Sequence, residues 1–217
     1  MNENLVKIPT KKADLEGDLQ LPADAKGLVL FAHGSGSSRH SPRNRFVADI
    51  LQKGGLGTLL IDLLTKEEEK EDEVTAALRF DIDLLTDRLC FVTQWFQARK
   101  ETGLLPIGYF GASTGAAAAL CASAEMKKKI VAVVSRGGRP DLAKNSLAAV
   151  ESATLLIVGG HDLPVIDMNE EAYALLKCEK KMVIIPGATH LFEEPGALEE
   201  VARLALDWFQ SHFDAKY

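Results

Sequence analysis

Short apolar runs alternate with stretches of helical periodicity along most of this chain. The apolar runs are Leu28–Ala32, Leu56–Ile61, Leu104–Phe110, Ile130–Ser135, Thr154–Val158 and Met182–Ile185. The stretches between and after them predict helices over Pro42–Lys53, Leu78–Arg99, Ala116–Ala124, Val165–Leu176 and Leu198–Phe209. Strands that are apolar throughout are typical of a parallel sheet covered by helices on both faces. The pattern therefore predicts an α/β fold with a mostly parallel central sheet.

Two further segments depart from this alternation. Leu5–Ile8 and Leu15–Leu21 precede it, and the second alternates apolar and polar residues as a half-buried strand does. We expect these two segments to form an antiparallel N-terminal pair. Lys66–Glu73 is a run of charges, which we interpret as a solvated loop. The segment between the Ile130 and Thr154 strands is too short for a separate cap, so we expect residues 1–217 to form a single domain without a large cap.

Composition narrows the classes of function. The chain has 217 residues and a net charge of −6, which disfavours nucleic acid as a partner. No apolar run approaches the roughly 20 residues needed to cross a bilayer, so we expect no membrane association. The cysteines Cys90, Cys121 and Cys178 are odd in number and show no paired spacing, which favours free thiols and a cytoplasmic protein. No cluster has metal-ligand spacing, so we expect no metal or cofactor. We also expect a monomer or a small homo-oligomer.

The clearest chemical motif lies between an apolar strand and an alanine-rich helix. Gly111, Ser113 and Gly115 form a Gly-x-Ser-x-Gly pentapeptide there. This is the context of a nucleophile elbow, in which a sharp strand-to-helix turn exposes the serine and leaves no space for side chains two residues away. The motif predicts Ser113 as a nucleophile.

Candidate partners of the serine follow later strands. Asp162 comes just after the Thr154–Val158 strand, and His190 follows the last strand. The carboxyl ends of parallel strands meet at one edge of a sheet, so these side chains should converge with Ser113. His190 would act as the general base and Asp162 would orient its ring. Asp141 also follows a strand end and stays open as an alternative acid.

The oxyanion of an acyl-transfer reaction needs backbone donors. The N–H of Thr114, directly after the nucleophile, is one candidate. The second candidate is the N–H of Ser35, in the loop His33–Ser38 that follows the Leu28–Ala32 strand. We expect His33 to shape this loop.

Together these motifs carry a family resemblance. Phe31–Arg39, the elbow, Gly160–Asp162 and Gly187–His190 occur in order and resemble the dienelactone-hydrolase-like branch of the α/β-hydrolases. The resemblance implies the α/β-hydrolase fold and hydrolysis of small or short-acyl carboxylic esters, a small-molecule substrate. Dienelactone hydrolases proper carry a cysteine nucleophile, whereas this chain has Ser113, which favours a general serine esterase. Lactone hydrolysis, acyl transfer and a non-catalytic binding protein remain as alternatives.

Five arginines lie near the same sheet edge without an evident partner in sequence: Arg39, Arg43, Arg45, Arg136 and Arg139. Cations at the start of a helix oppose its dipole, so a specific role is expected of the first three. They either pair with Glu193, Glu194 or the acidic segment, or they attract an anionic substrate. Arg39 and Arg136 are closest to their strand ends and are the candidates for a substrate mouth.

Overall fold

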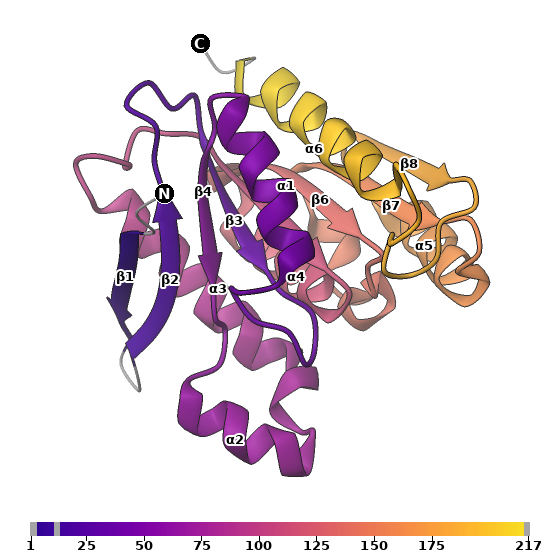
Figure 1. The fold of residues 1–217 in the computed structure, drawn as a ribbon, viewed down its shortest axis with the longest axis horizontal. Coiled ribbons are helices and arrows are strands. Elements are labelled where there is room, and N and C mark those ends of the chain that lie inside the picture. The colour runs from indigo at the N-terminus through magenta and orange to yellow at the C-terminus, as the bar shows by residue number, and fades with distance from the viewer. Residues whose placement is uncertain (1–3, 11–13, 215–217) are drawn as a thin grey trace.

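One eight-stranded sheet runs through the protein in the order β1-β2-β4-β3-β5-β6-β7-β8 (Figure 1). This computed structural model describes residues 4–10 and 14–214. The strands are β1 (Asn4–Pro9), β2 (Asp14–Gln20), β3 (Leu28–Ala32), β4 (Gly57–Ile61), β5 (Ile107–Ala112), β6 (Ile130–Arg136), β7 (Ala153–Gly159) and β8 (Lys180–Ile185). Pairing is antiparallel for β1 with β2 and β2 with β4, and parallel from β4 to β8. The predicted fold class is therefore confirmed, including the antiparallel N-terminal pair.

Helices cover both faces of this sheet (Figure 1). They are α1 (Pro42–Lys53), α2 (Lys66–Thr75), α3 (Ile82–Gln97), α4 (Thr114–Met126), α5 (Leu163–Leu175) and α6 (Ala197–Asp214), with short 3₁₀ turns η1 (Leu78–Phe80), η2 (Lys127–Lys129), η3 (Pro140–Ala143) and η4 (Leu147–Ala149). α1 and α6 lie side by side on one face, and α3, α4 and α5 lie on the other. No helix within the described ranges is long and apolar enough to span a bilayer.

The apolar strands are explained by this two-sided cover. In β3, Leu28 and Leu30 face the core under α3 and α4, whereas Val29 and Phe31 face the core under α1 and α6. Successive side chains of a strand point to opposite faces, so both sets must be apolar. The two cores hold the carboxyl ends of β3, β5, β6, β7 and β8 at one edge, where the candidate residues lie.

The prediction for Lys66–Glu73 was wrong: this segment forms most of helix α2. Thr65 caps the helix by accepting from the backbone N–H of Glu68, and the Glu68 carboxylate accepts from the N–H of Thr65. Glu67, Glu68 and Glu69 occupy the first turn, where negative charge stabilises a helix. The run of charges contains a capping box, and α2 projects from the edge of the sheet where the candidate residues lie (Figure 1).

The helix predicted from Leu78 begins instead at Ile82. Asp81 accepts a 3.0 Å hydrogen bond from the N–H of Leu84 and so caps α3, while Leu78–Phe80 forms the separate turn η1. An aspartate that caps a helix stops the apolar periodicity from extending backward as one continuous helix. Cys90, Cys121 and Cys178 are free thiols, the first two buried and the third half-buried.

Candidate active site

Ser113 stands at a strained turn between β5 and α4. Its φ of 50° and ψ of −120° lie outside the regions that L-residues usually adopt. A Cβ on Gly111 would lie 2.4 Å from the Cα of Ala116, and a Cβ on Gly115 would lie 2.2 Å from the carbonyl oxygen of Ala32. The two glycines are therefore required by close backbone approach, as the elbow motif predicts.

Asp162 and His190 form a hydrogen-bonded pair at two adjacent strand ends. Asp162 follows β7 and directly precedes α5, and His190 lies in the loop after β8. The Nδ1–H of His190 donates to Oδ2 of Asp162 over 2.6 Å. The carboxylate therefore fixes the ring orientation and leaves Nε2 available for proton exchange.

The end of β6 joins the nucleophile to this pair. The backbone N–H of Ser113 donates to the carbonyl of Arg136 over 3.3 Å. In the next residue, a Cβ on Gly137 would lie 3.5 Å from Cε1 of His190. Ser113 and His190 thus both contact the two-residue segment Arg136–Gly137.

The alternative acid is engaged elsewhere. Asp141 forms a bidentate ion pair with Arg139, with distances of 2.9 and 2.7 Å. The hydrogen bonds from Arg139 hold the pKa of Asp141 below its usual value. The carboxylate that bonds to His190 is therefore that of Asp162, whereas the carboxylate of Asp141 bonds to Arg139.

His33 is a buried histidine that shapes the neighbouring loop. Its Nδ1–H donates to the carbonyl of Gly34 over 3.0 Å, and its Nε2 accepts from the N–H of Leu63 over 3.2 Å. Burial lowers its pKa, which favours the neutral ring that these two bonds require. His33 therefore links the β3 loop to the end of β4 and has no nitrogen left for catalysis.

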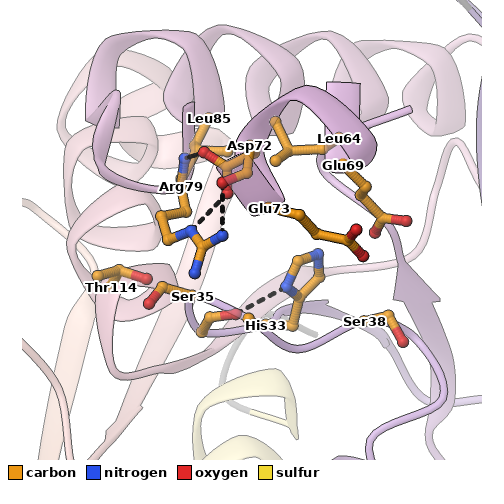
Figure 2. Close-up of a pocket in the computed structure, with 12 residues that line it drawn as sticks. His33, Ser35, Ser38, Leu64, Glu69, Asp72, Glu73, Arg79, Leu85 and Thr114 are labelled. Atoms are coloured by element: carbon orange, nitrogen blue, oxygen red, sulfur yellow. Dashed lines mark hydrogen bonds and ion pairs between the residues drawn. The ribbon is translucent and has the colours of Figure 1, made fainter. Parts of the chain in front are cut away.

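The loop after β3 lies against the nucleophile. A Cβ on Gly34 would lie 3.0 Å from the Cβ of Ser113. Ser35 and Thr114, the residues whose N–H groups are the oxyanion candidates, both line a cavity of about 460 Å³ (Figure 2). The cavity therefore extends to the two residues whose N–H groups are the oxyanion candidates.

Helix α2 and the turn η1 supply the opposite wall of this cavity. Glu69, Asp72, Glu73 and Arg79 line it together with the apolar Leu64 and Leu85 (Figure 2). Asp72 accepts from the backbone N–H groups of Leu78 and Arg79 and forms an ion pair with the Arg79 guanidinium. Despite burial, these hydrogen bonds from Arg79 and Leu78 keep the pKa of Asp72 below its usual value.

We did not predict from the sequence that Arg79 and the acidic residues Glu69, Asp72 and Glu73 line a cavity. A signal for them existed, because the Lys66–Glu73 segment follows β4, which ends at the same edge of the sheet as the candidate residues, and ligands of parallel sheets bind at that edge. The Asp72–Arg79 pair closes η1 onto α2 and so gives this wall a defined shape.

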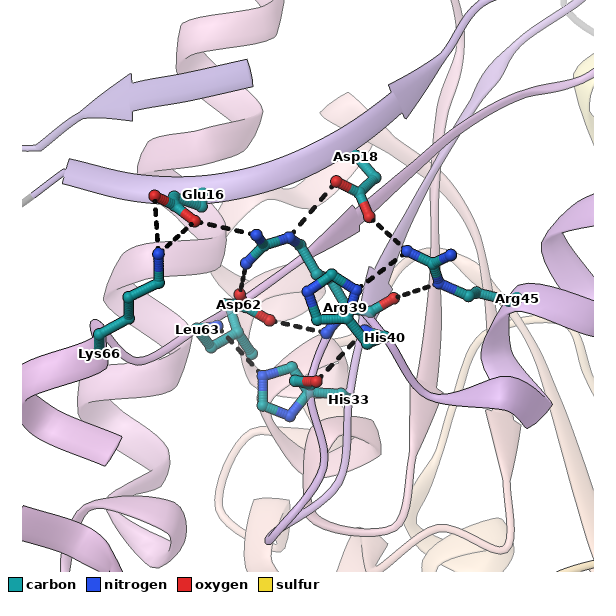
Figure 3. Close-up of polar contacts among 10 residues, drawn as sticks. Glu16, Asp18, His33, Arg39, His40, Arg45, Asp62, Leu63 and Lys66 are labelled. Atoms are coloured by element: carbon teal, nitrogen blue, oxygen red, sulfur yellow. Dashed lines mark hydrogen bonds and ion pairs between the residues drawn. The ribbon is translucent and has the colours of Figure 1, made fainter. Parts of the chain in front are cut away.

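Arg39, a candidate for the substrate mouth, does not line this cavity. Its guanidinium forms ion pairs with Glu16, Asp18 and Asp62, and its backbone N–H donates to Asp62 over 2.7 Å (Figure 3). Only 10% of its side chain is exposed. Arg39 therefore fastens the loop after β3 to β2 and to the end of β4.

The remaining arginines of the group also lie apart from the cavity. Arg45 pairs with Asp18 over 2.9 Å, and Arg43 pairs with Glu193 over 3.0 Å. Arg136, the second candidate for the mouth, is buried beneath the loop that carries His190. In the described ranges, no three His, Cys, Asp or Glu side chains converge to hold a metal ion.

Known proteins resemble this chain over nearly its whole length. A crystal structure of dienelactone hydrolase from Anabaena variabilis is 58% identical, with a TM-score of 0.95, and the match covers 97% of this chain and 98% of that one. Est1E from Butyrivibrio proteoclasticus is 16% identical with a TM-score of 0.80 over 98% and 99% of the two chains, a likeness of fold. No protein-family model matches the chain.

Two curated relatives from Mycobacterium tuberculosis are longer. Each is 52% identical over 212 residues and carries the provisional name of phosphoribosyl transferase. The match covers 98% of this chain but 47% of each relative, so the chain spans about half the length of the curated relatives it matches.

Proposed function

Because the chain belongs to the dienelactone-hydrolase-like α/β-hydrolases, we propose that it is a serine hydrolase of small or short-acyl carboxylic esters. One observation carries this proposal: Ser113 on its strained turn and the Asp162-bound His190 contact the same segment, Arg136–Gly137. A serine hydroxyl is too weakly acidic to attack an ester unaided, and a histidine oriented by a carboxylate is the group that activates it.

Acylation in this proposal begins with attack of Ser113 Oγ on the ester carbonyl. His190 Nε2 takes the hydroxyl proton while Asp162 holds the Nδ1 proton in place. The tetrahedral oxyanion accepts hydrogen bonds from the N–H groups of Ser35 and Thr114. Collapse breaks the bond to the alcohol oxygen, which leaves with the proton from His190, and the acyl group stays on Ser113.

Deacylation repeats these steps with water. His190 takes a proton from the water as its oxygen attacks the acyl carbon, and the same two N–H groups stabilise the second oxyanion. The bond to Ser113 Oγ then breaks, and His190 returns the proton to the serine. The acid product departs through the 460 Å³ cavity or past the exposed edge of His190.

Lactone hydrolysis is the second candidate, favoured by the 58% identity to the Anabaena variabilis protein named dienelactone hydrolase. In a lactone the leaving alkoxide stays attached to the acyl group, so a single hydroxy acid forms. Product analysis separates ester from lactone hydrolysis, and competing alcohols detect acyl transfer. The transferase name belongs to two mycobacterial relatives that are about twice as long as this chain.

A fluorophosphonate probe tests the central step. We expect it to label one residue, Ser113, as identified by the mass of its peptide, and we expect Ser113→Ala to prevent labelling while the protein stays folded. Unlabelled wild-type protein would instead indicate a non-catalytic binding protein. A panel of neutral esters of increasing acyl length, read against Ser113→Ala, then tests the preference for short acyl groups.

A further inference from the structure

Arg136 carries a buried guanidinium of which two nitrogens lack a hydrogen-bond partner. Its exposure is 7%, and neither Nε nor Nη1 has a hydrogen-bond partner. Ion pairs engage Arg39, Arg45, Arg79, Arg88 and Arg139, but none involving Arg136 is found among the described residues. A buried charge without a partner is strongly destabilising, so such a group calls for a counter-charge that comes from outside the chain.

The surroundings of Arg136 add positive charge. Arg136 ends β6 and shares its face of the strand with Val134, in the core under α1 and α6. The ring of Phe192 lies 6.0 Å from its guanidinium carbon. Burial first, and then the charge of Arg43, lower the pKa of Arg136 to about 10. At neutral pH it is therefore still a cation beside a second cation.

Arg43 is itself only partly satisfied. Its Nη1 contacts Glu193, whose side chain is 63% exposed, but its Nε is buried without a partner. Arg43 is also the second residue of α1, at the positive end of that helix. Two guanidiniums and a helix N-terminus thus lie near one another, and the ion pair found for them among the described residues is the one from Arg43 to the solvent-exposed Glu193.

We propose that Arg136 and Arg43 bind a small monoanion, such as a halide or a short carboxylate, beneath the loop that carries His190. Guanidiniums bind such anions through charge-assisted hydrogen bonds, and the burial of Arg136 limits the occupant to a compact ion. The ion offsets the repulsion between α1 and the end of β6. It also holds Phe192, two residues after His190, against the strand that contacts Ser113.

Thermal unfolding tests this site without any measurement of catalysis, so its result stands apart from that of the proposed esterase activity. The wild-type protein is titrated with sodium chloride, bromide, formate or acetate, and sodium gluconate keeps the ionic strength constant throughout. We expect a saturating rise in Tm of about 3–6 °C at tenfold the dissociation constant, with no such rise in gluconate alone. Identical Tm values in all anions would overturn the proposal.

The titration also separates the two sources of anion. A response to halides identifies a spherical inorganic ion, whereas a response confined to formate and acetate identifies a carboxylate, the chemistry of the proposed acid product. Either response requires Arg136. Arg136→Met, which keeps the chain length without the charge, should abolish the rise, and its Tm in gluconate should be no lower than that of wild type.

Arg203→Met is the matched control, because Arg203 is an exposed arginine on α6 with its own carboxylate partners. It should keep the full anion response. An unchanged response in Arg136→Met would contradict the assignment. Should that variant not fold, wild-type crystals grown in bromide decide the question: an anomalous peak within hydrogen-bond distance of Arg136 supports the site, and its absence there overturns it.

Discussion

The Nδ1–H of His190 donates a 2.6 Å hydrogen bond to Oδ2 of Asp162, a residue 28 positions earlier in the chain. The bond joins the ends of β7 and β8, two neighbouring parallel strands. Asp162 therefore selects the tautomer in which Nε2 of His190 is free to accept a proton. Asp162 contacts His190, whereas Asp141 pairs with Arg139, so substitutions of these two aspartates should have different effects on activity.

Asp162→Asn should lower kcat by about 10⁴-fold, by analogy with the triad of the serine proteases, because an amide can hold the ring in the wrong tautomer. The measurement is steady-state hydrolysis of a neutral short-acyl ester. Asp141→Asn serves as the control and should change kcat little, because Asp141 only pairs with Arg139. The opposite ranking of the two variants would move the acid to Asp141.

Gly137→Ala should lower kcat by about threefold to tenfold, because displacing a catalytic group by 1 Å can cost about 10²-fold and a smaller shift costs correspondingly less. Gly137 has a φ of 50°, and a Cβ there would lie 3.3 Å from the carbonyl oxygen and 3.5 Å from Cε1 of His190. The contact with the carbonyl oxygen is tight, so the added methyl group should shift the His190 backbone by a few tenths of an ångström, whereas the contact with the ring is an ordinary one.

Gly187→Ala is the matched control for that variant. Gly187 also has a positive φ, of 75°, and lies in the loop of His190, but a Cβ there meets nothing within 4 Å. Both variants should lose about 1–2 kcal/mol of stability from backbone strain, while only Gly137→Ala loses kcat. Equal kcat in the two variants would show that contact with His190 is unimportant.

Glu68→Gln should weaken the attachment of helix α2 to Arg88 of helix α3. Glu68 pairs with the buried Arg88, and this hydrogen bond, with those from Thr65, holds the pKa of Glu68 below its usual value of 4.5. Glutamine keeps the capping box but removes the charge, so the free energy of unfolding at pH 7 should fall by about 1.5–3 kcal/mol.

The pH dependence of that loss has a defined sign. The folded-state pKa of Glu68 is lowered, so its contribution is fully present above the unfolded-state pKa and disappears as pH falls through the folded-state value. Denaturant unfolding of both proteins from pH 7 down to pH 3 measures this. The difference between wild type and Glu68→Gln should shrink below about pH 4.5, and a constant difference would exclude the ion pair as its cause.

The cavity should favour neutral esters over analogues that carry a free ω-carboxylate. Arg79 is neutralised by Asp72, whereas Glu69 and Glu73 have no cationic partner on the cavity wall. Glu69→Gln should raise kcat/KM for the anionic ester relative to the neutral one by about threefold to tenfold at low salt, and less at high salt. Glu71→Gln, an exposed change on the same helix outside the cavity wall, should leave the ratio unchanged.

The same preference should weaken in mild acid. Burial and the charge of Asp62 raise the pKa of Glu69, so this carboxyl begins to be neutralised above the pH at which an ordinary glutamate does. The ratio of kcat/KM for the neutral ester to kcat/KM for the anionic ester should therefore decrease as the pH is lowered toward that range. This decrease should be larger in wild type than in Glu69→Gln. A preference for the anionic ester at every pH would show that the cavity charges do not control binding.

Local sequence was enough to predict the fold and the strand-end residues. Apolar runs identify strands covered on both faces, and parallel strands bring their carboxyl ends to one edge. Ser113, Asp162 and His190 could therefore be proposed together from position alone. The glycines of the elbow could be read in the same way, because backbone proximity across one turn is a local property.

The arginines and α2 could not be predicted in this way, because charge does not specify its partner along the chain. Arg39 meets Glu16, Asp18 and Asp62 only once β2 and β4 lie beside the loop after β3. Arg79 lines the cavity while its guanidinium pairs with Asp72 of α2. Arg136 has no ion pair in the part of the chain that the structure describes. The parallel sheet and the strand-end candidates Ser113, Asp162 and His190 could be predicted from local sequence patterns. Which charges pair could not, because pairing depends on distances between segments that lie far apart in the chain.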